Sequence, residues 1–175
     1  MVFIITGEIG IGKTTVCLKL VDIVRSSGYT CGGILTEKAA GGDITVENIN
    51  SGEKEILAST LDTFQEGSRT GKYYFYPRGI DFGIRSIASG SFAEILFIDE
   101  IGQLELNGEG FTGTLEICNA SKAQCVLVIR KWLLPDYLPL LPADPIIFET
   151  TMANRDQLPH EIAGILLKNL RRKEV

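Results

Sequence analysis

The segment from Gly7 to Thr14 has residues whose types and spacing could hold phosphate. It reads Gly-Glu-Ile-Gly-Ile-Gly-Lys-Thr and matches the P-loop pattern G-x-x-x-x-G-K-S/T at every fixed position. The glycines permit a tight turn whose backbone N–H groups face one concavity, at the positive end of the helix that follows. The lysine can reach the β- and γ-phosphates, and the threonine hydroxyl can ligate Mg²⁺. The motif therefore predicts a nucleoside triphosphate site at Gly7, Glu8, Ile9, Gly10, Ile11, Gly12, Lys13 and Thr14, with Thr15 as a second hydroxyl nearby.

Two acids, Asp99 and Glu100, end a second apolar segment, Glu94 to Asp99, which reads Glu-Ile-Leu-Phe-Ile-Asp and is typical of a buried strand. An aspartate at the end of a strand beside a P-loop can hold magnesium through its water shell, so we predict a metal site at Thr14 and Asp99. Glu100 is suited to orient and partly deprotonate an attacking water, so we predict it as catalytic together with Lys13. The alternative for each acid is a purely structural role.

Arg130 and Lys131 follow another apolar segment, 126–129. Either cation could reach the γ-phosphate edge as a charge stabiliser supplied by the same chain. The simpler expectation is a solvated charge at the end of a strand. The proline-broken loop 132–145 that follows is apolar, and a lid, a partner surface and plain packing are all compatible with its composition.

The elements that must position these residues follow from the apolar periodicity. Short buried runs predict strands at 2–6, 33–36, 94–99, 126–129 and 146–150, and helical spacing predicts helices at 16–24, 78–88, 109–119 and 154–172. Between about residues 38 and 76, glycines separate short segments at 44–49, 53–57 and 72–76, which indicates an insertion of hairpins. The sequence thus predicts an α/β fold: a three-layer P-loop sandwich with a mainly parallel sheet and a small antiparallel hairpin insertion.

The amino-acid composition limits the number of domains and the kinds of partner that we expect. The chain has 175 residues and 45% hydrophobic content, which favours one compact domain over residues 1–175. With 17 basic and 22 acidic residues, the net charge is −5, so neither nucleic acid nor an acidic membrane surface is expected as a partner. The chain has 19 glycines, and we assign most of this surplus to turns.

Cysteine and histidine usage argues against zinc and disulfides. The four cysteines show no C-x-x-C pair, and the single histidine, His160, cannot complete a metal site with them. The apolar run at the N-terminus stops at Gly7, after too few residues for a signal peptide or a membrane span. We therefore expect a cytoplasmic protein with reduced thiols and no membrane association.

Four segments together resemble the THEP-type family of small P-loop nucleoside triphosphatases. They are Gly7–Thr14, Gly33–Glu37, the Ile-Asp-Glu-Ile-Gly-Gln-Leu-Glu-Leu block at 98–106, and Thr-Met-Ala-Asn-Arg at 151–155. The resemblance spans nearly the whole chain, and it implies a RecA-like or kinase-like sandwich with slow, Mg²⁺-dependent hydrolysis and little base selectivity. It also implies nucleotide contacts at Thr151, Asn154 and Arg155. The chain departs from the family pattern at Gln103-Leu104 and Ile129-Arg130.

Three functions remain compatible with these residues. The leading hypothesis is Mg²⁺-dependent hydrolysis of nucleoside 5′-triphosphates, such as ATP and GTP, to the diphosphate and phosphate. The rival enzyme is a phosphotransferase that acts on a small nucleoside, nucleotide or vitamin-like acceptor held by residues 38–76. The third is a nucleotide-dependent switch or adaptor that binds a partner through the loop 132–145.

Overall fold

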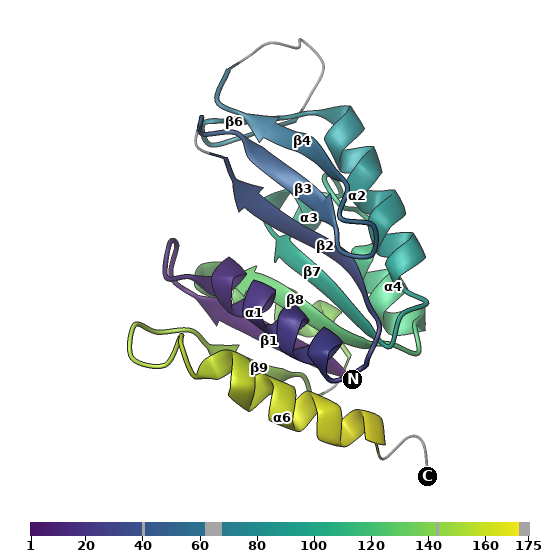
Figure 1. The fold of residues 1–175 in the computed structure, drawn as a ribbon. Coiled ribbons are helices and arrows are strands. Elements are labelled where there is room, and N and C mark those ends of the chain that lie inside the picture. Colours follow the sequence, from purple (N-terminus) through teal and green to yellow (C-terminus); the bar gives the residue numbers. More distant parts are fainter. Residues whose placement is uncertain (40, 62–67, 143, 172–175) are drawn as a thin grey trace.

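The computed structural model describes residues 1–39, 41–61, 68–142 and 144–171. Its strands are β1 (Val2–Gly7), β2 (Cys31–Lys38), β3 (Ile44–Asn48), β4 (Lys54–Ser59), β5 (Ser68–Thr70), β6 (Tyr73–Phe75), β7 (Ile95–Ile101), β8 (Gln124–Arg130) and β9 (Ile146–Glu149). Its helices are α1 (Lys13–Ser26), α2 (Pro77–Gly90), α3 (Gln103–Leu106), α4 (Thr114–Ala120), α5 (Leu134–Tyr137) and α6 (Leu158–Arg171), with 3-10 turns η1 (Lys131–Leu133) and η2 (Leu138–Leu140). Within the described residues the strands form one sheet in the order β5-β6-β4-β3-β2-β7-β8-β1-β9 (Figure 1).

Strands β2, β7, β8, β1 and β9 are parallel, and the first four carry buried core residues on both faces. Successive side chains of a strand point to opposite faces, so an uninterrupted apolar run such as β1 can serve two cores. Phe3 and Ile5 pack in the cluster under α1 and α6, whereas Val2 and Ile4 pack in the cluster that also contains Ile87 of α2. Figure 1 shows α1 and α6 side by side across the strands β1, β8 and β9.

The sheet is mixed rather than mainly parallel, because the predicted hairpins extend it instead of lying apart. β3 pairs antiparallel with β2, β4 with β3, β6 with β4, and β5 with β6. An outer parallel strand has unpaired backbone groups along its free edge, and the hairpins satisfy those of β2. Residues 40 and 62–67 of the predicted insertion lie outside the described part of the chain.

Two predicted helices begin later than their apolar patterns suggested. The helix expected at 109–119 begins at Thr114, because Gly110 and Gly113 both adopt positive φ and cannot continue a right-handed helix. The helix expected from Asn154 begins at Leu158, because the residues before it form a turn. Arg172, its predicted last residue, lies outside the described residues.

Part of the glycine surplus serves close packing rather than turns. A Cβ on Gly79 of α2 would lie 2.2 Å from the Ile56 carbonyl oxygen, and one on Gly90 would lie 2.1 Å from the Gly33 nitrogen. Atoms this close must move apart, and here the obstacles are backbone atoms. The glycines therefore let α2 lie directly on the antiparallel strands and on β2, a role that the sequence did not indicate.

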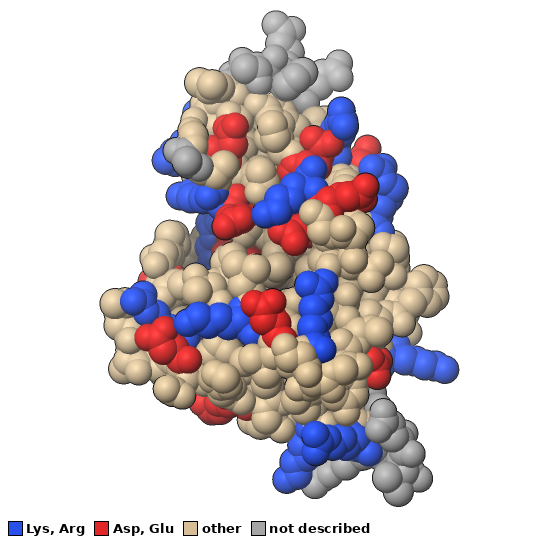
Figure 2. All heavy atoms as spheres, in the orientation of Figure 1, with Lys and Arg blue, Asp and Glu red and all other residues tan. Residues whose placement is uncertain are grey.

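Acidic and basic side chains alternate over the surface that Figure 2 draws. Ion pairs on the surface include Lys19–Asp156, Lys54–Glu37, Lys54–Glu47 and Lys131–Glu149. The four cysteines are buried, and none of them forms a disulfide. In the described part of the chain, no helix combines the length and apolar character needed to cross a bilayer.

Candidate active site

The turn between β1 and α1 has the backbone shape of a phosphate cradle. Gly7, Gly10 and Gly12 adopt φ of 147°, 77° and 105°, conformations that residues with a side chain rarely adopt. A Cβ on Gly7 would lie 2.8 Å from the Thr150 carbonyl oxygen, so this glycine also allows the end of β9 to approach the loop. Glu8 and Ile9 are exposed on the outer side of the turn, and Ile11 is partly buried.

Lys13 is folded into the loop that it follows. Its side chain is buried, and Nζ donates hydrogen bonds to the carbonyl oxygens of Gly7 at 3.1 Å and Glu8 at 2.9 Å. Burial lowers the pKa of Lys13, while the nearby charges of Glu100 and Asp99 act in the opposite direction. The ammonium group is therefore held at the centre of the cradle, next to both acids.

Asp99 is fully buried within β7, where the ladder to β8 is irregular between Ile98 and Ile101. The strand was expected to end at Asp99, but it continues to Ile101. Neither carboxylate oxygen of Asp99 forms a hydrogen bond of normal geometry with a described residue. Burial and then the Glu100 charge raise the pKa of Asp99 to about 7, and the Thr14 hydroxyl lies near enough to act in the opposite direction.

An orphaned buried carboxylate beside a threonine hydroxyl has the oxygen donors that a hard divalent cation prefers. Thr14, the first threonine of α1, is partly buried, whereas Thr15 is exposed. The described residues contain no cluster of three or more His, Cys, Asp or Glu that could hold a metal by protein ligands alone. A cation here would therefore need oxygens from phosphate or water in addition to Thr14 and Asp99.

Glu100 forms an ion pair with Arg130, the last residue of β8. Arg130 Nε donates to Glu100 Oε1 at 2.7 Å, and Nη2 lies 2.6 Å from the same oxygen. The simpler expectation for Arg130, a solvated charge at the end of a strand, is therefore wrong. Lys131 differs, because it forms a half-exposed ion pair with Glu149 at 2.6 Å.

Two residues to which the sequence assigned no role support the turn after Glu100. Glu105 accepts hydrogen bonds from the N–H groups of Gly102 at 2.7 Å and Phe111 at 2.8 Å. The bond to Gly102 is one half of a capping box for α3, since glycine has no side chain to complete the other half. Tyr137 donates its hydroxyl to the Gly102 carbonyl at 2.6 Å. The Gly-x-x-Glu spacing was a visible capping signal, whereas nothing local in the sequence points to Tyr137.

The loop 132–145 is packed through part of its length. Leu133 and Tyr137 are buried in the cluster that contains the ends of β7 and β8, while Trp132, Leu138 and Leu140 are exposed. Its chain forms η1, α5 and η2 in succession. Residue 143 lies outside the described residues. Packing therefore accounts for the buried side of this loop.

The segment 151–155 reaches the P-loop through Arg155. A Cβ on Gly12 would lie 3.8 Å from Arg155 Cδ, and Arg155 forms no ion pair with another described residue. Asn154 is used within the turn itself: Oδ1 accepts from the Thr151 N–H at 2.8 Å, and Nδ2 donates to the Glu149 carbonyl at 2.9 Å. The turn therefore leaves the Arg155 cation free beside the cradle.

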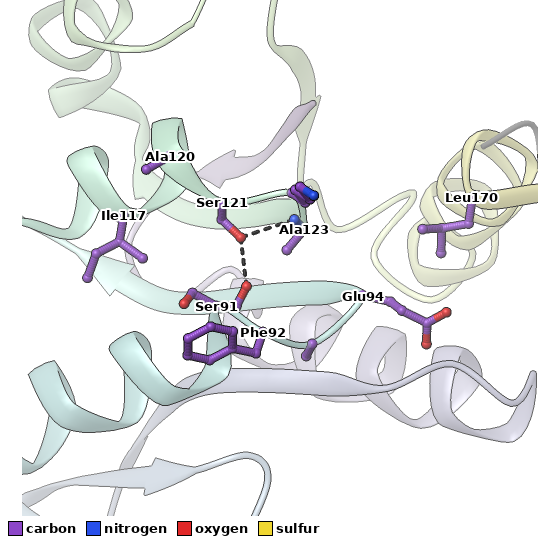
Figure 3. Close-up of a pocket in the computed structure, with 10 residues that line it drawn as sticks. Ser91, Phe92, Glu94, Ile117, Ala120, Ser121, Ala123 and Leu170 are labelled. Carbon is purple, nitrogen blue, oxygen red and sulfur yellow. Dashed lines mark hydrogen bonds between the residues drawn. The ribbon is translucent and has the colours of Figure 1, made fainter. Parts of the chain in front are cut away.

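A separate cavity of about 730 Å³ lies at the opposite end of the parallel strands (Figure 3). Its walls come from the segments that precede β7 and β8 and from Leu170 of α6. The Ser121 hydroxyl there donates to the Ser91 carbonyl at 2.8 Å and accepts from the Ala123 N–H at 3.0 Å, so it is used within the loops. The polar groups needed for phosphate chemistry gather at the other end, around the P-loop.

The fold and this site have the form of an α/β protein that binds a nucleotide on a P-loop. A family model described as NTPase matches residues 2–163. The curated relatives include the nucleoside-triphosphatase THEP1 of Thermotoga sp. (strain RQ2), 33% identical over 181 residues that cover 99% of this chain and 100% of the relative. The THEP1 of Thermotoga maritima is 31% identical over 185 residues, with 99% and 100% coverage.

Two solved structures have the same fold. The crystal structure of THEP1 from the hyperthermophile Aquifex aeolicus matches with a TM-score of 0.71 and 26% identity, over 95% of this chain and 99% of that chain. The solution structure of a human cancer-related nucleoside triphosphatase gives a TM-score of 0.74 over 94% and 96% of the two chains, and at 22% identity it supports the fold alone. The chain belongs to the NTPase family. The resemblance to THEP-type proteins and the class of enzyme, a nucleoside-triphosphatase, are both confirmed.

Proposed function

We propose that this nucleoside-triphosphatase hydrolyses nucleoside 5′-triphosphates, ATP and GTP among them, to the diphosphate and phosphate in a Mg²⁺-dependent reaction. One observation carries the proposal: the buried Lys13 ammonium lies inside a glycine turn with Asp99 and Glu100 beside it. The backbone N–H groups of residues 7–14 bind the phosphate oxygens. Lys13 exchanges its two carbonyl acceptors for phosphate oxygens and keeps its charge at the centre of the site.

Thr14 and Asp99 are the residues that would hold magnesium. Their donors are all oxygens, and neither oxygen of Asp99 forms a hydrogen bond of normal geometry with a described residue, which fits a hard cation. Bound there, the ion would neutralise charge on the β- and γ-phosphates. Because the pKa of Asp99 is raised to about 7 by burial and by the Glu100 charge, we expect its carboxylate to bind cations better as the pH rises through neutrality.

Glu100 orients the attacking water. The water oxygen forms a bond to the γ-phosphorus while the bond from that phosphorus to the bridging oxygen breaks, and the diphosphate leaves with the bridging electron pair. The Glu100 carboxylate accepts a hydrogen bond from the water and receives its proton as the new bond forms. We assign Glu100 Oε2 to this task, because Oε1 is engaged by Arg130.

Arg155 is our candidate for a further nucleotide contact. It lies beside Gly12 and has no acidic partner among the described residues, so a phosphate oxygen could pair with it. Asn154 and Thr151 were expected to touch the nucleotide as well. Their hydrogen bonds to each other instead support a role in holding the turn that presents Arg155.

We also propose a three-layer arrangement, with α1 and α6 on one face of the sheet and α2 and α4 on the other. The separate clusters under these two helix pairs support it. The chain would act as one catalytic domain, because the parallel and antiparallel strands share a single sheet. Four cysteines that form no disulfide favour a reducing compartment such as the cytoplasm.

The test measures phosphate release from ATP and from GTP, with Mg²⁺ present or chelated. We expect release with either nucleotide and its loss on chelation. Glu100→Gln should lower the turnover number by roughly 100-fold or more and leave triphosphate affinity within about threefold. Glu149→Gln is the matched control, because it alters an acid at the same edge of the sheet and should leave turnover unchanged.

Three results would overturn parts of this proposal. Turnover of Glu100→Gln at the wild-type rate would remove the assigned role of Glu100. Phosphate release that strictly requires an added nucleoside or vitamin-like acceptor would favour a phosphotransferase. Release that begins only when a partner protein is added would favour the switch instead.

A further inference from the structure

We infer that Arg130 is a positioning residue for hydrolysis, which holds Glu100 by one carboxylate oxygen and leaves the other facing the attacking water. The inference rests on the water-orienting role proposed for Glu100.

The place of Arg130 in the sheet sets its reach. β8 lies between β1, which leads into the P-loop, and β7, which carries Glu100. Arg130 is the ladder partner of Gly7, the first residue of the P-loop. A long side chain that starts at this point lies between the phosphate cradle and Glu100. Its charge also reaches the cradle, because Arg130 lowers the pKa of Lys13, although burial of Lys13 is the larger cause.

The contact is specific to one oxygen. Both Nε and Nη2 of Arg130 approach Glu100 Oε1, at 2.7 and 2.6 Å, and no described residue donates a hydrogen bond to Oε2. Two donors on one planar group fix the direction of the carboxylate more firmly than a single bond does. The Glu100 side chain is still 23% exposed, so a water can reach it. The guanidinium therefore orients Glu100 without using the oxygen that the reaction needs.

Neighbouring cations do not provide this contact. Lys131 is paired with Glu149, and Arg155 lies at Gly12 without an acidic partner among the described residues. Loss of the Arg130 guanidinium would leave the Glu100 side chain free to rotate. Because misplacing a catalytic group by about 1 Å can cost roughly 100-fold in rate, we expect kcat to fall between about 10-fold and 100-fold.

The experiment is a double-mutant cycle with Arg130→Ala, Glu100→Gln and the two changes combined. Single-turnover assays with radiolabelled ATP resolve the slow variants, and titration with a non-hydrolysable triphosphate and with ADP measures binding. Arg130→Ala should lower kcat by 10-fold to 100-fold, with KM and both affinities within about threefold of wild type. In the Glu100→Gln background it should cause no further loss, because Arg130 acts through Glu100.

Two further variants keep the test decisive. Arg130→Lys retains the charge with a single donor group, so kcat should lie between those of wild type and Arg130→Ala even if the alanine variant folds poorly. Lys131→Ala is the matched control, since it removes the neighbouring cation and should leave kcat unchanged.

Three outcomes would overturn the inference. A further loss of kcat from Arg130→Ala in the Glu100→Gln background would mean that Arg130 acts on the phosphates directly. The same conclusion would follow if Arg130→Ala weakened triphosphate binding more than ADP binding. Wild-type kcat in Arg130→Ala would mean that the ion pair has no part in the reaction. The Glu100→Gln variant alone tests the water-orienting role, so failure of that role is read separately from failure of this inference.

Discussion

The parallel and antiparallel halves of the sheet differ in burial as well as in strand direction. Every residue of β1 is buried, and β8 is buried except for its last residue, whereas β3 has a single buried residue and β6 has none. Apart from the edge strand β9, which has a single buried residue, the parallel half packs against helices on both faces. The buried side chains of the antiparallel half, such as Val46 and Leu57, belong to the cluster that contains Ile87 of α2.

This difference explains why the chemistry lies in one half. Glu100 and Arg130 lie in the last residues of β7 and β8, and Lys13 begins the helix after β1; each of these strands is paired on both sides, so their backbone positions are held firmly. The antiparallel strands protect the edge of β2 and support α2 through close backbone contact. We therefore expect changes in the parallel half to alter catalysis or stability strongly, and changes in the antiparallel half to alter stability alone.

The largest effect should come from Lys13→Ala. Loss of the ammonium removes the cation that the cradle offers to phosphate, so kcat/KM should fall by roughly 1000-fold or more, which is about 4 kcal/mol of transition-state stabilisation. The free energy of unfolding should stay close to that of wild type, because burial of Lys13 lowers its pKa and so already disfavours its charge in the folded protein.

Phosphate-release kinetics measure the expected loss of kcat/KM, and urea unfolding measures the expected constancy of the unfolding free energy. Lys19→Ala is the matched control, since Lys19 is on the same helix and forms an exposed pair with Asp156. A loss of less than about tenfold in kcat/KM for Lys13→Ala would contradict the assigned role.

The second prediction compares one substitution in both halves. Leu127 of β8 is fully buried, and Leu57 of β4 is 3% exposed. Leu127→Ala should cost about 4 kcal/mol of unfolding free energy and Leu57→Ala about 2.5 kcal/mol, because a cavity between two packed layers collapses less readily than one near an edge. Urea unfolding gives both values. An equal or reversed order would remove the distinction between the halves.

Uninterrupted apolar runs allowed the strands of the parallel half to be predicted from the sequence. The strands predicted at 2–6, 94–99 and 126–129 are present with shifts of a few residues, and the P-loop lies where its pattern places it. The hairpins were predicted as strands too. The sequence did not predict that they join the same sheet, because a short alternating segment carries no local signal for the edge with which it pairs.

The residues that position the site side chains were harder to predict, because their contacts also join segments that are distant in the sequence. The contact between Arg130 and Glu100 joins residues 30 positions apart, and the bond from Tyr137 to Gly102 spans 35. Asn154 was read as a polar group for the nucleotide, yet its amide bonds the turn around it. Sequence spacing reveals partners within one element or motif, whereas these contacts depend on which strands become neighbours.

The third prediction tests the close approach of α2 to the antiparallel strands. Gly79→Ala places a methyl group 2.2 Å from the Ile56 carbonyl oxygen, a backbone atom that cannot turn away. Overpacking of this kind costs about 1–3 kcal/mol, and the better helix propensity of alanine offsets up to about 1 kcal/mol. We expect a net loss of stability in thermal unfolding, with unchanged kcat.

Gly164→Ala in α6 is the matched control for that change. No atom lies within 4 Å of a Cβ built there, so only the helix propensity acts. The variant should be more stable than wild type by about 0.5–1 kcal/mol. If both substitutions shifted the unfolding temperature in the same direction, the close approach of α2 would not be the cause.

The smallest effect is expected for Lys54→Met on the surface of the antiparallel half. Lys54 pairs with Glu47 at 3.0 Å and Glu37 at 3.3 Å, and its side chain is 48% exposed. Exposed pairs contribute at most about 1 kcal/mol and are screened by salt, so the difference from wild type should shrink as salt rises.

Hydrogen bonds to the two glutamates raise the pKa of Lys54, so its contribution to stability is present below the ordinary lysine pKa of 10.5 and is lost as pH rises through the higher folded value. Urea unfolding at low and high salt, at neutral pH, measures this, and a salt-independent loss above about 1 kcal/mol would mean that the antiparallel half depends on its surface charges rather than on its contact with α2.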